Sequence, residues 1–177
     1  MKPKKAAKHY TDTHKEKTAV SIEMQPIGIV HSPFKERFVA PRQPDLAKPT
    51  AGTIELYNGS NFEQALSDLD SFTHIWVIYW MHLNQGWNPT VMPPRGSDIR
   101  RGLFSTRAPH RPNSIGLSVV KLTSINKRNL QIEGLDMLDG TPVLDIKPYL
   151  PYADNIEGAS HGWLNPNACF PFSSTLK

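Results

Sequence analysis

Hydrophobic and polar residues alternate over several short stretches of this sequence, and prolines interrupt nearly every longer apolar run. Alternation with a period of two predicts half-buried strands. The 16 prolines exclude long helices over most of the chain, because proline removes a backbone donor and restricts the residue before it. We therefore predict short strands at residues 24–31, 52–57, 72–82, 102–107, 115–125, 130–135 and 142–146.

Two of these stretches form the clearest β-hairpin, because residues 115–125 and 130–135 flank a turn at residues 127–129. Residues 72–82, FTHIWVIYWMH, are rich in β-branched and aromatic side chains, which predicts a central strand buried on both faces. A buried helix is the alternative there, since periodicity cannot separate the two in so short an apolar run.

One helix is predicted from its start signal. Ser60 and Glu63 have the spacing of a capping box, so a short helix should run from Ser60 through about Leu69. Six or seven short strands with one or two short helices and long loops predict an all-β fold, a small single antiparallel β-barrel or a strongly curved sheet.

The formal net charge of +4 has a local origin. Residues 1–20 hold six lysines and two acids, so residues 21–177 carry 14 basic and 14 acidic side chains. This pattern predicts a Lys-rich flexible arm at 1–20. We expect a single barrel domain at 21–157, with one hydrophobic core, and a C-terminal tail at 158–177.

Several classes of protein are excluded by composition. The longest apolar run, residues 75–81, is far shorter than the roughly 20 residues that cross a bilayer. No apolar segment follows the basic N-terminus, so we expect no secretory signal. Cys169 is the single cysteine and cannot form an intrachain disulfide, which favours a reducing, cytoplasmic location.

The glycines and histidines exclude two kinds of site. No two glycines lie within two positions of each other, so the chain has neither a phosphate-binding loop nor the glycine-rich loop of a Rossmann domain. His74 and His82 are eight residues apart, which on one strand separates them by about 26 Å. They cannot share a metal ion, and we predict no metal site.

Two segments carry opposite charge. Residues 95–111 hold five arginines and one acid, whereas residues 133–157 hold six acids and one lysine. Guanidinium groups suit an anionic ligand, and the acidic segment suits a cationic or hydroxyl-rich group. The alternative is that the two segments pair with each other or are simply solvated.

Four longer phrases carry a resemblance. They are IGIVHSPFKERFVAPRQP, LDSFTHIWVIYWMH, PPRGSDIRRGLFSTRAPHRPNSIGLS and LDMLDGTPVLDIKPYLPYAD, in this order between about Gln25 and Asp154. Together they resemble the TsaA-like family. The resemblance implies a small antiparallel β-barrel that binds S-adenosyl-L-methionine without a Rossmann domain, usually as a homodimer with the cofactor near the subunit interface. It also implies methyl transfer to the exocyclic nitrogen of threonylcarbamoyl-adenosine, next to the anticodon of tRNA.

The same resemblance implies a cofactor site. Arg107 is expected to bind the methionyl carboxylate, backbone groups of 135–138 to read the adenine edge, and Leu46 and Leu117 to sandwich its ring. The alternatives are that Arg107 pairs with an acid of 133–157, that His82 meets no ligand, and that Leu117 and Leu135 belong to the core. The full set of implied cofactor-binding residues is Pro44, Asp45, Leu46, His82, Leu83, Arg107, Leu117, Leu135, Asp136, Met137 and Leu138.

On the substrate side the resemblance directs attention to Arg111 and Asn113 for binding and to Asp145, Lys147 and Tyr149 for catalysis. A basic residue beside a stacking aromatic suits an unstacked base of the anticodon loop. Asp145 is the candidate for accepting the proton that the nitrogen loses. The alternative for these residues is that they only hold the geometry of the loops.

The chain departs from the family pattern at Ser114, where the loop often has proline, and it ends about 23 residues after Asp154, before the C-terminal domain of the larger bacterial members. We expect the Lys-rich arm to take over part of the tRNA binding if that domain normally contributes to it. Two other functions stay open: methyl transfer to a different small molecule or nucleobase, and a non-catalytic cofactor-sensing or RNA-binding module.

Overall fold

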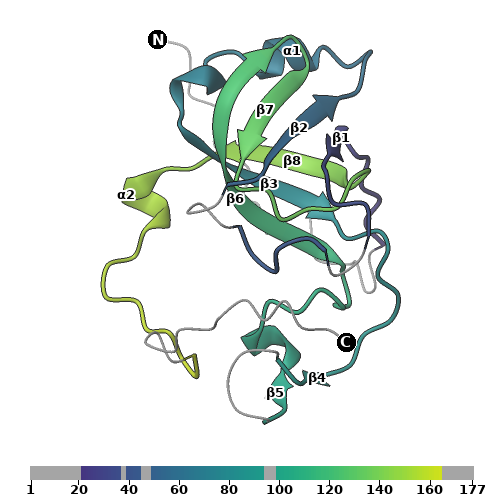
Figure 1. Ribbon diagram of the computed structural model, residues 1–177, viewed down its shortest axis with the longest axis vertical. Coiled ribbons are helices and arrows are strands. Elements are labelled where there is room, and N and C mark those ends of the chain that lie inside the picture. The colour runs from purple at the N-terminus through teal and green to yellow at the C-terminus, as the bar shows by residue number, and fades with distance from the viewer. Residues whose placement is uncertain (1–20, 37–38, 45–48, 94–98, 165–177) are drawn as a thin grey trace, which may run out of the picture.

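Six antiparallel strands close into a barrel in the computed structural model, which describes residues 21–36, 39–44, 49–93 and 99–164 (Figure 1). The order around the barrel is β1-β2-β7-β6-β3-β8, so every strand has two neighbours. This confirms the predicted all-β barrel. The strands are β1 Gly28–His31, β2 Ala51–Leu56, β3 His74–Trp80, β6 Ile115–Asn126, β7 Asn129–Glu133 and β8 Pro142–Pro148.

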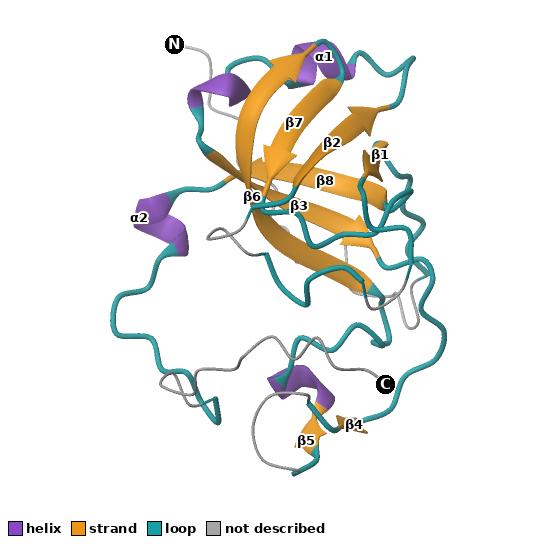
Figure 2. Ribbon diagram, in the orientation of Figure 1, coloured by secondary structure: helices purple, strands orange, loops and turns teal. Residues whose placement is uncertain are grey.

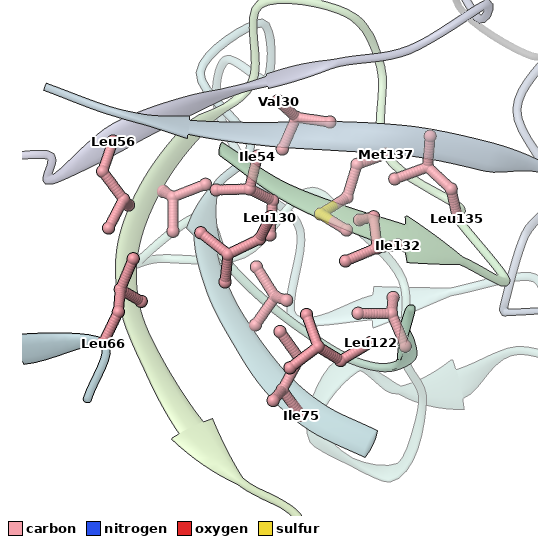
Figure 3. Close-up of a cluster of buried hydrophobic side chains, with 13 residues drawn as sticks. Val30, Ile54, Leu56, Leu66, Ile75, Leu122, Leu130, Ile132, Leu135 and Met137 are labelled. Carbon is pink, nitrogen blue, oxygen red and sulfur yellow. The ribbon is translucent and has the colours of Figure 1, made fainter. Parts of the chain in front are cut away.

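The barrel interior is the hydrophobic core (Figure 3). Because side chains alternate along a strand, every second residue points inward. The 13 buried side chains of the cluster come from all six strands and from the segments that close the barrel ends. They are Val30, Ile54, Leu56, Leu66, Ile75, Val77, Val120, Leu122, Leu130, Ile132, Leu135, Met137 and Val143.

The apolar stretch at 72–82 forms β3, as predicted, and no helix. The prediction that it is buried on both faces is wrong. Ile75 and Val77 are fully buried, whereas Trp80 is 47% exposed. A six-stranded barrel has a single interior, so only one face of each strand can contribute to the core. The other face of β3 belongs to the outside of the barrel.

The predicted hairpin is confirmed as β6 and β7. Asn126 pairs with Asn129, which leaves Lys127 and Arg128 as a two-residue turn. Lys127 has a φ of 52°, in the left-handed region that a tight hairpin turn requires. The long β6 then continues beyond β7 and also pairs with β3 through residues 115–121.

The predicted helix is shorter than expected and starts differently. It is reduced to α1, Phe62–Ala65, and a separate 3₁₀ turn, η2, at Leu69–Ser71. The capping-box prediction at Ser60 is wrong, because the N-cap is Asn61 in a left-handed conformation without a side-chain cap bond. A second short helix, α2, spans Pro151–Asp154 and follows β8.

A small unit lies apart from the barrel (Figure 2). It contains β4, Thr90–Val91, paired with β5, Arg101–Gly102, and then the 3₁₀ turn η3, Leu103–Ser105. The predicted strand at 102–107 is therefore wrong after its first residue, because the chain turns at Leu103, whose side chain is buried.

The segment after α2 returns to this β4–β5 unit. The indole nitrogen of Trp163 donates to the carbonyl of Ser105 at 2.9 Å, and the guanidinium of Arg101 lies 5.0 Å from the Trp163 ring centroid. The predicted arm at 1–20 and the last 13 residues of the predicted tail lie outside the described residues, so these boundaries stay predictions. Within the described part of the chain, no helix is long and apolar enough to span a membrane.

Candidate functional site

The wall formed by β3 and β6 separates two different surfaces. Val77 pairs with Ser118 and Ile78 pairs with Leu117 in the antiparallel register. Ser118 is 2% exposed and faces the interior, whereas the neighbouring Leu117 is 54% exposed and faces outward. We call the outward-facing residues of β3, β6 and β8 the outer wall, and the end of the barrel where β3 ends and β6 begins the mouth.

Three polar side chains meet inside the mouth. The hydroxyl of Ser118 donates to the carboxylate of Asp136, whose two oxygens lie 2.8 and 3.0 Å away. The Tyr79 hydroxyl lies 3.3 Å from the same Ser118 oxygen. We call these residues, Tyr79, Ser118 and Asp136, the mouth network. They come from β3, from β6 and from the segment after β7.

Burial dominates the electrostatics of this network. It raises the pKa of Asp136 to about 6, because desolvation outweighs the hydrogen bond from Ser118 and the attraction of Arg107. Burial, together with the nearby Asp136 charge, raises the pKa of Tyr79 to about 12. Buried ionisable side chains whose pKa values are perturbed by desolvation and a nearby charge are typical of functional sites.

The two residues that flank Asp136 belong to the core. Leu135 and Met137 are each 1% exposed, so their side chains point into the barrel. The backbone N–H of Leu135 donates to the carbonyl of Thr50 at 3.2 Å. Within the predicted segment 135–138, Asp136 is therefore the residue whose polar side chain can contact a ligand.

The predicted catalytic residues lie together on the outer wall. Asp145 and Leu117 are both register partners of Ile78, on its two sides, so they lie about 10 Å apart across the sheet. Lys147 forms an ion pair with Asp145, with the Nζ atom 2.8 Å from the carboxylate. The Tyr149 ring packs beside Trp76 with 5.9 Å between centroids. A cation, a carboxylate and two aromatic rings thus share one surface.

The predicted substrate-binding residues lie in the loop before β6. The guanidinium of Arg111 donates to the carbonyl of Thr106 at 3.1 Å and lies 5.6 Å from the centroid of the Phe104 ring. A hollow of about 280 Å³ opens between Phe104, Arg111, Pro112, Asn113 and Ile115. Arg111 thus stabilises its own loop and also lines this hollow.

The arginine-rich segment is only partly available to ligands. Arg100 donates to the hydroxyl and carbonyl of Thr90, and Arg101 lies over Trp163, so both hold the β4–β5 unit together. Arg107 is exposed and makes no hydrogen bond or ion pair with any described residue. No ion pair among the described residues joins this segment to the acids of 133–157, and the link between the two is the longer-range attraction of Arg107 to Asp136.

Of the remaining cofactor candidates, His82 and Leu83 follow β3 at its mouth end, where the backbone N–H of His82 donates to the carbonyl of Trp80. Pro44 is half-buried in the loop between β1 and β2, whereas Asp45 and Leu46 lie outside the described residues. The sequence analysis missed Tyr79 and Ser118. The signal was a serine at an inward position of the otherwise apolar strand β6.

Comparison with known proteins gives a consistent result. The chain matches the family described as tRNA-methyltransferase O N-terminal domain over residues 29–155. It is 43% identical over 147 residues to the tRNA (adenine(37)-N6)-methyltransferase of Escherichia coli (strain K12), covering 79% of this chain and 63% of that protein. The chain thus spans less than two thirds of that relative.

Other relatives are closer in length or known in three dimensions. The probable S-adenosyl-L-methionine-binding protein of Methanothermobacter thermautotrophicus is 42% identical over 137 residues, which cover 77% of this chain and 96% of that protein. The crystal structure of TrmO from Pseudomonas aeruginosa superposes with a TM-score of 0.68 and 42% identity, covering 81% of this chain and 62% of that chain.

Proposed function

Because the chain belongs to the tRNA-methyltransferase O N-terminal domain family, we propose that it is an S-adenosyl-L-methionine-dependent methyltransferase that acts on tRNA. The observation that carries this proposal is the 43% identity to a tRNA (adenine(37)-N6)-methyltransferase across 79% of this chain. The compartment that holds the tRNA substrate is the cytoplasm, which is where we place the enzyme.

The residues at the mouth fit the proposed cofactor. Asp136 offers a buried carboxylate to hydrogen-bond donors, and Arg107 offers an exposed guanidinium to the methionyl carboxylate. A relative that this chain covers over 96% of its length is named as a probable S-adenosyl-L-methionine-binding protein. We therefore expect the barrel alone to be large enough to form the cofactor site.

The proposed acceptor is the exocyclic nitrogen of threonylcarbamoyl-adenosine in the anticodon loop. When bound, S-adenosyl-L-methionine supplies a methyl group on a positively charged sulfur. The residues of this chain have to orient the nitrogen and take the proton that it loses as its bond to the methyl carbon forms. Asp145 is the proposed proton acceptor, and Lys147 holds its carboxylate in place through their 2.8 Å ion pair.

The aromatic side chains beside this ion pair support binding of an unstacked base. Tyr149 and Trp76 lie with their ring centroids 5.9 Å apart on the same surface, and Lys147 occupies the register position opposite Trp76. Proteins recognise single-stranded RNA by stacking such rings on bases and by placing cations beside the phosphates. Arg111 and Asn113, at the hollow before β6, are the proposed contacts to the neighbouring nucleotides.

The proposed enzyme is a homodimer that uses the outer wall of β3 and β6. Trp80 and Ile115 are register partners and are 47% and 39% exposed, and Leu117 follows Ile115 on the same face. Exposed apolar side chains in adjacent positions are typical of an interface, and a two-fold axis would bring the same patch of both copies together. Since Leu117 and Asp136 lie on opposite faces of one wall, both can line one cofactor site most simply when Leu117 comes from the second copy.

Transfer of a labelled methyl group tests the proposal. The wild-type protein should methylate tRNA that carries threonylcarbamoyl-adenosine and should leave tRNA without this modification unlabelled. Asp145→Asn should lower kcat by about 100-fold or more, because it removes the proton acceptor. The matched control is Glu133→Gln, which breaks the Lys121–Glu133 ion pair elsewhere on the barrel and should change kcat by less than about twofold.

A second candidate function keeps the cofactor and omits the transfer. Its support is that a relative that this chain covers over 96% of its length is named only as a probable cofactor-binding protein. Calorimetry with S-adenosyl-L-methionine separates the two candidates. Binding without transfer to any tRNA would favour a cofactor-sensing module or a different acceptor, whereas absence of binding would exclude both.

A further inference from the structure

Two members of the mouth network, Tyr79 and Ser118, have no part in the function proposed above. Ser118 is almost fully buried, and its single hydroxyl contacts both carboxylate oxygens of Asp136 at 2.8 and 3.0 Å. Tyr79 approaches the same hydroxyl from the neighbouring strand at 3.3 Å. A polar chain of this kind inside an apolar barrel costs desolvation energy, so its presence requires a reason.

The hydrogen bonds of this network have a defined direction while Asp136 is ionised. A serine hydroxyl has one hydrogen to donate, and an ionised carboxylate can only accept. Ser118 therefore donates to Asp136, and Tyr79 in turn donates to Ser118. The chain of donors runs from β3 through β6 to the carboxylate and ends there.

Gly116 makes room for this arrangement. It is the register partner of Tyr79, and a Cβ atom at this position would lie 2.2 Å from two carbons of the Tyr79 ring. Any other residue at position 116 would displace the ring and with it the hydroxyl that reaches Ser118. The phrase IGLS at 115–118 thus contains two positions, Gly116 and Ser118, that serve the same network.

The carboxylate retains capacity for a further donor. An ionised carboxylate accepts about four hydrogen bonds, and Ser118 and the backbone N–H of Asp136 itself supply only part of this number. The groups that act on it are Tyr79 from β3, Ser118 from β6 and Arg107 from the loop before β6. Burial raises the pKa of Asp136 to about 6 in spite of them.

We propose that Tyr79 and Ser118 are positioning residues of the cofactor site, which hold the Asp136 carboxylate so that it accepts an N–H or O–H donor of the bound cofactor. This inference rests on the proposed function. S-adenosyl-L-methionine carries such donors on its adenine amine, its ribose hydroxyls and its ammonium group. A carboxylate fixed by two strands loses less conformational freedom on binding than a mobile one, which increases the affinity.

Calorimetric titration with S-adenosyl-L-methionine tests the positioning role. Ser118→Ala should weaken binding about tenfold, and Tyr79→Phe, which keeps the ring and removes the hydroxyl, about threefold. The control is Thr123→Val on the same strand, which removes a hydroxyl that donates to the carbonyl of Gln131 and should leave the affinity unchanged. Thermal unfolding confirms that each variant is folded at the temperature of the titration.

The pH dependence of binding gives a readout that a merely structural role would not change. Wild-type affinity should fall as the pH drops through about 6, because protonated Asp136 loses acceptor capacity. Ser118→Ala should move this midpoint to higher pH, because it removes a hydrogen bond that favours the ionised form. Asp136→Asn should abolish the midpoint. A midpoint that is unchanged in Ser118→Ala would overturn the inference.

A ligand series identifies the donor. S-adenosylhomocysteine retains the ammonium group, whereas 5′-methylthioadenosine lacks it and retains the adenine and ribose. If Asp136→Asn weakens binding of both compounds, the donor is on the nucleoside; if it weakens only the first, the donor is the ammonium group. No loss with either compound overturns the inference. If the wild-type protein binds none of these ligands, the proposed function fails together with the inference.

Discussion

Successive side chains of β3 and β6 point alternately to the inner and the outer face of the barrel, and the two faces differ in character. Inside, Ile75, Val77 and Val120 are fully buried and leave no freedom for a change of shape. Outside, Trp80 and Leu117 remain about half exposed. The inner face therefore determines whether the barrel forms, and the outer face is available for a partner and a substrate.

At the mouth, the inner and the outer face both contribute candidate residues of the cofactor site. Ser118 lies on the inner face one residue after Leu117 on the outer face, and each is a candidate for the same cofactor site. Alternation thus places a proposed positioning residue and a proposed contact residue in adjacent sequence positions. The following predictions test whether the two faces are as independent as this comparison indicates.

The largest effect should come from the inner face. Ile75→Ala should lower the free energy of unfolding by about 2–5 kcal/mol, because it opens a cavity in a closely packed core. Leu117→Ala on the outer face should lower it by less than about 1 kcal/mol in the monomer. Urea unfolding at low protein concentration measures both. Equal losses would contradict the separation of the two faces.

The next effect should appear on the outer face alone. Leu117→Asp should weaken the proposed homodimer by about 100-fold or more, because it places an unpaired charge within an apolar interface. Sedimentation velocity across a concentration series reports the dissociation. The unfolding free energy of the monomer should stay close to that of the wild type. A wild-type protein that is monomeric at all concentrations would refute the dimer.

Gly116→Ala should destabilise the barrel by about 1–3 kcal/mol, since the new methyl group would collide with the Tyr79 ring on the inner face. Gly102→Ala is the matched control, because nothing lies within 4 Å of a Cβ atom there. Thermal unfolding compares the two variants. If both melt together with the wild type, the ring of Tyr79 is not confined by Gly116.

The smallest effect concerns two aspartates that are three residues apart. The folded-state pKa of Asp136 is raised to about 6 by burial, so its contribution to stability is complete below about pH 4 and is lost as the pH rises through 6. The pKa of Asp139 is lowered by its ion pair with Lys35 and the backbone N–H of Ser32. Its contribution is therefore present above about pH 4 and is lost as the pH falls through the depressed value.

Asp136→Asn should accordingly raise the unfolding free energy at pH 8 by about 1 kcal/mol, whereas Asp139→Asn should lower it slightly, by less than about 1 kcal/mol. Unfolding in urea between pH 3 and pH 8 measures both curves. The gain in Asp136→Asn should disappear near pH 4. Parallel curves for the two variants would show that Asp136 and Asp139 are equally solvated.

Much of the fold followed from patterns within the sequence. The alternation along β6 and β7 and the turn between them predicted the hairpin, because these signals are local. Errors occurred where tertiary contacts decided. The chain turns at Leu103 into a 3₁₀ segment that ends at Ser105, whose carbonyl accepts a hydrogen bond from Trp163, 58 positions further on, and no local signal reports such a contact.

The candidate site divides in the same way. The sequence phrases directed attention to Asp136, Asp145 and Lys147, because all three lie in one of the segments that carry the family resemblance. They did not indicate that Asp136 lies within the mouth and the other two on the outer wall. That assignment depends on strand register, where a shift by one residue reverses the face of every side chain.

The sequence by itself determined that the chain forms short antiparallel strands and that it has no glycine-rich phosphate loop. Periodicity, proline content and residue type are properties of the chain alone. Only the tertiary structure decided that Tyr79 and Ser118 join Asp136, because these residues are far apart in sequence and meet through the closure of the barrel. Closure gives each strand one inner and one outer face, and this separates the core and the mouth network from the surface proposed to bind tRNA.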